Sequence, residues 1–229
     1  MKRFWTEVAV DAEGVVTLDG RPVRTPGRVP LALPTASLAA LVAGEWRAVP
    51  ETVDPRAMPL TGLANAAIDR IAADPRTFAA GLAAYGDSDL LCYRAESPDV
   101  LIARQRAAWD PWLDWARARY DVHFETVAGI VHRAQPAATL ARLGDAVAAL
   151  DAFRLAGLSP VVTITGSLVL ALALIERAGD TETLWNAAHV DEDWQADLWG
   201  EDTLATQARA NKRREFDAAA AFLAALERP

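Results

Sequence analysis

The sequence predicts an α+β protein, with short β-strands and hairpins mixed with helices at the N-terminus and an all-helical region after them. Extended apolar runs separated by turn residues fill residues 4–33. Apolar residues then recur at spacings of three and four, which indicates helices, and this pattern continues almost unbroken after Ser97-Pro98. We therefore expect an α+β domain over residues 1–90 and a helical domain over residues 91–229.

The first strands are predicted by short apolar runs that end at turn residues. Asp19-Gly20 is the strongest of these turns, because both central positions of a two-residue hairpin need a positive φ. Pro22 places the returning strand at a sheet edge or makes it a strand start. The expected strands are Phe4–Val10, Val15–Leu18, Arg21–Thr25 and Val29–Leu33.

The helices of the first domain follow from caps and apolar stripes. Thr35 is a suitable N-cap for the first helix, and Thr61 for the second. Pro75 begins a third helix that ends near Tyr85, whereas residues 90–93 fit either a strand or a continuing helix. The apolar stripe of the first helix consists of Leu38, Leu41, Val42 and Trp46.

The second domain is predicted to be a succession of helices. Its first helix begins at Pro98, bends near Pro111 and ends near Tyr120. An irregular segment over residues 122–136 follows it. The remaining helices are expected over Pro136–Leu155, Ser159–Arg177, Thr181–Trp199 and Thr203–Leu226, with C′ glycines at Gly157 and Gly179.

Composition limits the function. The net charge of −8 argues against a general nucleic-acid binder, because such a surface repels phosphate. Cys92 is the one cysteine, so no internal disulfide is expected and a reducing compartment fits. We expect no signal peptide and no membrane insertion, since the longest apolar run, Val161–Ile175, is shorter than a bilayer span and suits a buried helix.

No enzyme motif stands out, and we expect no catalytic residue, metal or cofactor. The sequence has neither a dinucleotide-binding glycine motif nor a Walker A loop, and Ser167 lacks the spacing of a nucleophile elbow. His123 and His132 have no ligand partner at helical spacing, and a zinc site needs three or four clustered ligands. His189 precedes three acids, but consecutive helical residues point in different directions, which favours a solvated acidic face.

Seven segments of the chain form a recognisable set when they are read in order. The segments are RPVRTPGR, EW, MPLTGLANAAID, YGDSDLLCYRAESP, QRAAWDPWLDWA, GSLVLALAL and DEDWQADLWGED. The most specific part is YGDSDLLCYR followed by WDPWLDWA. Together the segments resemble one family, the alpha-subunit assembly chaperones of F-type ATP synthase, also called the ATP-twelve family, and the resemblance extends over most of the chain.

The resemblance implies a non-enzymatic chaperone with an α+β N-terminal domain and a helical C-terminal domain. It would bind the free alpha subunit of the ATP synthase and prevent its aggregation until alpha pairs with beta. Because the chain starts directly at the β region, without a presequence, we expect a bacterial, cytoplasmic member. We expect it to be a monomer when free and to form a one-to-one complex with its client.

The client-binding surface is expected in the segment DEDWQADLWGED, where large aromatic anchors stand among acids. Its candidate residues are Asp191, Glu192, Trp194, Trp199, Glu201 and Asp202. Packing between the last two helices is the alternative role for both tryptophans. Two other functions stay open: a hydrolase or metal-dependent enzyme that uses the Asp191–Asp202 carboxylates, and an adaptor for a different client.

A second set of residues is expected to have interdomain or structural roles. Asp87, Asp89 and Arg94 suggest an ion pair at the domain junction, because an Arg in such a place usually has a carboxylate partner. A tryptophan stripe that includes Trp109 is expected to face the core. The full structural set is Asp87, Asp89, Arg94, Trp46, Trp109 and Asp110.

Overall fold

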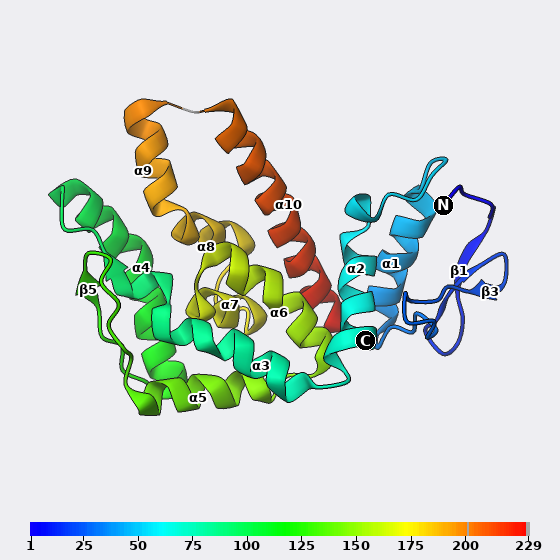
Figure 1. The fold of residues 1–229 in the computed structure, drawn as a ribbon, viewed down its shortest axis with the longest axis horizontal. Helices are drawn as coiled ribbons and strands as arrows, with labels where there is room; N and C mark the ends of the chain where they lie inside the picture. The colour runs from blue at the N-terminus through cyan, green and yellow to red at the C-terminus, as the bar shows by residue number, and fades with distance from the viewer. Residues whose placement is uncertain (201, 228–229) are drawn as a thin grey trace. The chain divides into compact units, whose positions relative to one another are not determined.

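A computed structural model of the chain describes residues 1–200 and 202–227. The chain forms two compact units (Figure 1). The first contains Met1–Pro75, Asp151–Gly157 and the described residues from Ala218 onward, and the second contains Arg76–Leu150 and Leu158–Asp217. Short N-terminal strands and a largely helical remainder confirm the α+β class.

The first unit begins with an antiparallel meander of three short strands, β1 (Val8–Val10), β2 (Val16–Leu18) and β3 (Arg21–Pro22). The expected turn is present, since Asp19 and Gly20 have φ values of 46° and 77°. The strands are shorter than predicted. The run expected at residues 29–33 forms only isolated bridges, Val15 with Ala32 and Arg24 with Pro30, and Pro30 has no N–H to donate to a longer ladder.

One helix covers this sheet region, and a second helix packs on the first. Helix α1 (Ala36–Ala48) packs against β1 and against α2 (Pro59–Ala66). A 3-10 turn, η1 (Pro55–Ala57), precedes α2, and a π turn, η2 (Ala67–Ile71), continues it.

The caps of these helices match the prediction in one case and differ in the other. The hydroxyl of Thr35 accepts the N–H of Leu38 at 3.2 Å, which confirms it as the N-cap of α1. Thr61 is not a cap, because α2 begins at Pro59 and the Glu45 carboxylate from α1 accepts the backbone N–H of Thr61 at 2.8 Å. Leu41 is exposed, so it does not belong to the buried stripe of α1.

The second unit is built from helices. It contains α3 (Pro75–Ala83) except for Pro75 itself, and α6 and α10 contribute residues to both units. The ambiguous residues 90–93 form a 3-10 turn, η4 (Leu90–Cys92), after another, η3 (Ala84–Ser88). Strand β4 (Tyr93–Arg94) follows and pairs in parallel with β5 (Val127–Ala128). The remaining helices are α4 (Asp99–Tyr120), α5 (Ala137–Ala148), α6 (Ala152–Thr165), α7 (Leu168–Ile175), α8 (Thr181–Ala188), α9 (Val190–Trp199) and α10 (Thr203–Leu226).

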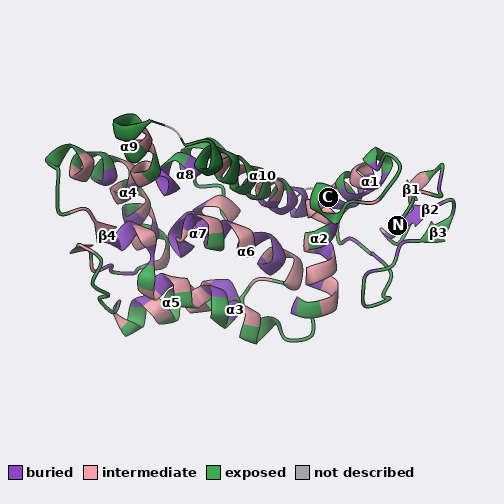
Figure 2. Cartoon of the chain, turned by 45° about the horizontal axis from the view of Figure 1, so that its top comes forward, coloured by how far each residue is buried: buried purple, intermediate pink, exposed green. Residues whose placement is uncertain are grey.

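Helix α7 is the centre of the second unit. Residues 168–173 are all buried, as the purple ribbon of α7 in Figure 2 shows, and α4 and α8 pack against it. The buried apolar run expected at residues 161–175 is therefore confirmed, but it breaks at Gly166, where Ser167 caps α7 through the N–H of Leu170. Within the described chain, none of the helices has both the length and the apolar character needed to cross a bilayer.

Several predicted helix boundaries are wrong. Asp151 accepts the N–H groups of Phe153 and Arg154 and so begins α6 inside a segment expected to be continuous. Gly157 lies in the interior of α6 rather than beyond a helix end. The helix expected over residues 181–199 breaks at His189, whereas α10 has the predicted bounds.

Candidate functional site

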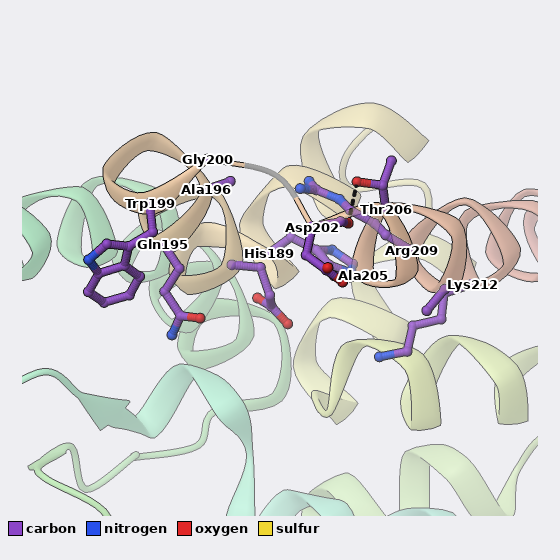
Figure 3. Close-up of a pocket in the computed structure, with 12 residues that line it drawn as sticks. His189, Gln195, Ala196, Trp199, Gly200, Asp202, Ala205, Thr206, Arg209 and Lys212 are labelled. Atoms are coloured by element: carbon purple, nitrogen blue, oxygen red, sulfur yellow. Dashed lines mark hydrogen bonds between the residues drawn. The ribbon is translucent and has the colours of Figure 1, made fainter.

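A groove of about 460 Å³ lies between α9 and the first turns of α10, within the second unit (Figure 3). That volume lies within the range of small-molecule pockets and can equally hold a few side chains of a partner. Trp199 and Gln195 lie at one end and Arg209 and Lys212 at the other. The groove is lined by His189, Glu192, Gln195, Ala196, Trp199, Gly200, Asp202, Ala205, Thr206, Ala208, Arg209 and Lys212.

Local sequence produces the reversal of the chain that forms this groove. Gly200 ends α9 with a φ of 78°, a conformation that glycine adopts without steric cost, and its N–H donates to the carbonyl of Ala196 at 2.9 Å. The Asp202 carboxylate accepts the N–H of Ala205 at 2.9 Å at the start of α10. The two helices therefore come from adjacent sequence and present the side chains of their facing turns to one space.

The edge of the groove is apolar and exposed. Trp199 is 78% exposed, Leu204 80% and Leu198 53%, and no residue of α9 is buried. Figure 2 shows α9 and the N-terminal part of α10 mainly in green and pink, in contrast to α7. One side of α9 packs on α4, but its outer side is exposed and partly apolar, so this outer face has the character of a partner surface.

The groove carries charges of both signs. The Glu192 carboxylate makes no ion pair with any described residue, and neither does the ammonium group of Lys212. Arg209 is held by Asp193 at 2.5 Å. Asp202 caps α10 but is exposed and pairs with no cation among the described residues. Two acids thus stay available to a partner.

His189 lines the groove although its side chain is almost fully buried, with 3% exposed. Its Nδ1 donates to the carbonyl of Trp185 at 2.8 Å, and its ring stacks on the Trp185 ring at 3.8 Å. Burial lowers the pKa of the imidazole, which favours the neutral ring. With the proton on Nδ1, Nε2 is a hydrogen-bond acceptor, and no described residue donates to it.

The predicted client-binding residues do not all meet. Glu192, Trp199 and Asp202 line the groove. Asp191 faces α4 and accepts from Gln105 at 2.8 Å, and Trp194 lies beneath the guanidinium of Arg104 at 4.8 Å. Glu201 lies outside the described residues.

The structural set is arranged differently from the prediction. Arg94 pairs with Asp110 at 2.7 Å and lies over the ring of Trp109 at 5.2 Å, so its expected pairing with Asp87 or Asp89 is wrong. Trp109 is buried, and its indole N–H donates to the carbonyl of Ala187 at 2.6 Å. These contacts all lie within the second unit.

Three further residues of that set have separate structural roles. Asp87 accepts the N–H of Gln135 at 2.8 Å. Asp89 is fully buried and accepts the N–H of Val169 at 2.9 Å, at the start of α7. Trp46 is buried in the first unit, with its ring 5.5 Å from that of Trp5.

The acids of α9 do not converge on a catalytic centre. Asp191, Asp193 and Asp197 each have a different polar partner, Gln105, Arg209 and Arg104. Among the described residues, no three His, Cys, Asp or Glu side chains are grouped so that they could hold a metal ion. This geometry lends no support to a hydrolase that uses the Asp191–Asp202 carboxylates.

Besides uncharged lining residues, sequence reasoning missed the three other titratable residues of the groove, His189, Arg209 and Lys212. His189 was assigned to a solvated acidic face, yet it stands four residues after Trp185, the spacing at which two helical side chains meet. That spacing is the one signal that places its ring on a buried aromatic. Nothing in the sequence around Arg209 or Lys212 indicates which face of the long helix they occupy.

Comparison with known proteins gives a family and close structural relatives. The sequence model described as ATP12 chaperone protein matches residues 2–117. Atp12 from Paracoccus denitrificans has a crystal structure with 39% sequence identity and a TM-score of 0.92, over 99% of this chain and 98% of that one. Its D202K mutant matches with 40% identity, a TM-score of 0.93 and the same coverage. A candidate chaperone from Agrobacterium tumefaciens matches with 41% identity and a TM-score of 0.93, over 99% of this chain and 86% of that one.

Proposed function

The chain belongs to the ATP12 chaperone family, and from this premise we propose that it binds the free alpha subunit of an F-type ATP synthase. It keeps alpha from aggregating and releases it when alpha pairs with the beta subunit. The family resemblance carried by the sequence motifs is confirmed, and the relatives with solved structures are bacterial.

The observation that supports a client-binding face most directly is the α9–α10 groove with its exposed aromatic edge. The surface through which alpha meets beta belongs to an obligate assembly, and such surfaces are large and apolar and aggregate when uncovered. A chaperone surface for them needs a few aromatic anchors within a polar surround. Trp199 and Leu204 supply the anchors, and Glu192 and Asp202 supply polar groups.

A small groove also suits release. An interface with few anchors and much exposed polar surface gives moderate affinity, so that beta can displace the chaperone from alpha. We propose a one-to-one complex between a free monomer and its client, without catalytic turnover, in the bacterial cytoplasm. The acidic composition is compatible with a protein client and disfavours nucleic acid.

Co-expression with the alpha subunit of the same host tests this function. The soluble fraction is separated by size-exclusion chromatography, and we expect alpha to stay soluble and to co-elute with the chaperone. If alpha precipitates equally with and without the chaperone and nothing co-elutes, the proposed function is wrong. Co-elution of another protein in place of alpha would support the adaptor alternative.

Substitutions in the groove locate the surface. We expect Trp199→Ala and Asp202→Lys to leave the fold intact, because both residues are exposed, and to reduce the co-eluting alpha by about tenfold. Phe4→Ala, which truncates an exposed aromatic ring of the first unit, is the matched control and should behave as wild type. Equal loss in the control would remove the support for this groove.

A further inference from the structure

We propose that the α9–α10 groove recognises a basic side chain of the client, best an arginine, whose charged end reaches Glu192, Asp202 and His189. This inference rests on the proposed function and gives the chemistry of the segment that the chaperone holds. The occupant of the groove is a segment of the client in which a basic residue stands beside apolar residues.

The polar groups of the groove that lack internal partners are mostly acceptors. The Glu192 carboxylate makes no hydrogen bond or ion pair with a described residue and acts only electrostatically, on the His189 ring. The Asp202 carboxylate accepts the N–H of Ala205, whereas Thr206 donates to the backbone carbonyl of Asp202. The Nε2 of His189 is a neutral acceptor at a nearly buried position, and its other ring nitrogen is held by Trp185. A set of acceptors on different residues selects a ligand with several donors, and a guanidinium has five.

The basic residues of the groove, Arg209 and Lys212, do not form ion pairs with these acceptors. Arg209 is engaged by Asp193, and no ion pair among the described residues joins Lys212 to Glu192 or Asp202. In Figure 3, Arg209 and Lys212 lie at the end opposite Trp199 and Gln195. Arg209 also acts on the His189 ring, but Asp193 compensates its charge, so a client cation is favoured away from Lys212.

The walls suit the stem of a long basic side chain. Ala196, Ala205 and Ala208 give the groove an apolar lining against which such a stem can pack, and the indole of Trp199 offers a face to which a guanidinium is attracted. Leu198 and Leu204 lie outside the lining and add exposed apolar surface at the helix ends. This combination fits a protein segment better than a free cation, which would have no use for the apolar surface.

A divalent metal ion is the other kind of ligand that a set of acceptors attracts. The described residues contain no group of three His, Cys, Asp or Glu able to hold one, and this excludes His189, Glu192 and Asp202 as a metal triad.

The test compares two acids in the same part of the second unit. Glu192→Gln removes the negative charge and keeps the shape of the side chain, whereas Glu192→Arg reverses the sign of the charge. Glu215, an exposed acid of α10 that does not line the groove, supplies the controls Glu215→Gln and Glu215→Arg. Binding to the purified alpha subunit is measured by titration. We expect Glu192→Gln to weaken binding about tenfold and Glu192→Arg more, with both Glu215 variants within about twofold of wild type.

Charge-reversal substitutions on the alpha subunit identify the basic side chain that Glu192 contacts. Each exposed Arg or Lys of alpha is changed to Glu, one at a time, and co-expressed with Glu192→Arg. We expect one such change to restore co-elution with Glu192→Arg and to weaken it with the wild-type chaperone.

The outcomes separate this inference from the function on which it rests. If wild-type protein binds alpha but the Glu192 variants bind like the Glu215 controls, or if no reversal restores the complex, the recognition of a basic side chain is wrong and the chaperone function stands. If wild-type protein does not bind alpha at all, both the chaperone function and the recognition of a basic side chain are wrong.

Discussion

At the residue scale, Asp89 shows how a buried carboxyl can organise a helix distant in sequence. Its Oδ1 accepts the N–H of Leu91 at 3.1 Å and its Oδ2 that of Val169 at 2.9 Å. Burial raises the pKa of Asp89 from 3.8 to about 6, even though hydrogen bonds from Val169 and Ser167 act in the opposite direction. The folded protein therefore binds this proton more tightly than the unfolded chain does.

This shift gives a pH dependence with a definite sign. The contribution of Asp89 to stability is fully present below pH 3.8 and is lost as the pH rises through about 6. Asn does not titrate, so the free energy of unfolding of wild type should fall relative to that of Asp89→Asn as the pH rises. We expect a change of about 2 kcal/mol between about pH 4.5 and about pH 7.5, measured by urea unfolding. A difference that stays constant, or changes in the opposite direction, would contradict this assignment.

Prediction from sequence was weakest for the hydrogen-bond partners of individual side chains. Glu45 accepts N–H groups at the start of α2, and Asp89 accepts one at the start of α7, where Ser167 is the cap, yet both acids are separated in sequence from these helices. A cap recognised by its position next to a helix, such as Thr35, was found, because the relevant atoms are three residues apart. Long-range partners depend on the packing of whole helices, which a local pattern does not contain.

At the element scale, the interior position of Gly157 in α6 reflects a close helix crossing in the first unit. A Cβ at this position would lie 2.7 Å from Cδ2 and 2.8 Å from Cγ of Leu223, a residue of α10. Leu223 is buried, so it has little room to move. Glycine is needed here for proximity of the two helices, not for a left-handed turn, and this explains why the expected C′ role was wrong.

Two glycine-to-alanine changes separate packing from helix propensity. Gly157→Ala should destabilise the protein by about 1–3 kcal/mol, because the overlap with Leu223 outweighs the gain in helix propensity. Gly44→Ala, in α1, meets no atom within 4 Å and should stabilise by up to about 1 kcal/mol. Thermal unfolding followed by circular dichroism measures both. Stabilisation by both changes would show that the α6–α10 crossing can relax.

Helices and turns were predicted correctly where sequence signals marked both of their ends. α10 has the predicted bounds, and the turn at Asp19-Gly20 is where the dipeptide placed it. The segment expected to be one helix from Pro136 to Leu155 is two, since Asp151 can cap a helix as well as continue one. For α9, pattern could not tell that Trp194 packs under Arg104 and that Trp199 is exposed, because both stand in the same acidic, helical context.

At the scale of the whole molecule, negative charge is concentrated in one stretch of the sequence. Between Arg177 and Arg209 there is no lysine or arginine. The acids of this stretch include both that line the groove, Glu192 and Asp202. All of them contribute to the net charge of −8: Asp180, Glu182, Asp191, Glu192, Asp193, Asp197, Glu201 and Asp202. A client with a basic surface would be attracted to this side of the chain before contact.

Binding to the alpha subunit should therefore weaken as salt is added. We expect the Kd to rise on the order of tenfold between about 50 and about 500 mM NaCl, since exposed charges are screened beyond a Debye length of about 4–14 Å over this range. Titration of alpha at several salt concentrations gives the slope of log Kd against log salt. The acidic stretch predicts that most of this change appears in the association rate.

Two variants show which part of the interface produces that slope. Trp199→Ala removes apolar contact area but no charge, so its Kd should be higher at every salt concentration while the slope stays that of wild type. Glu192→Gln removes a charge from the groove, so its slope should be smaller. A Kd that is independent of salt, or that falls as salt is added, would mean that apolar contact alone holds the client. In that case the acids of α9 would serve to keep the unoccupied face soluble rather than to select a partner.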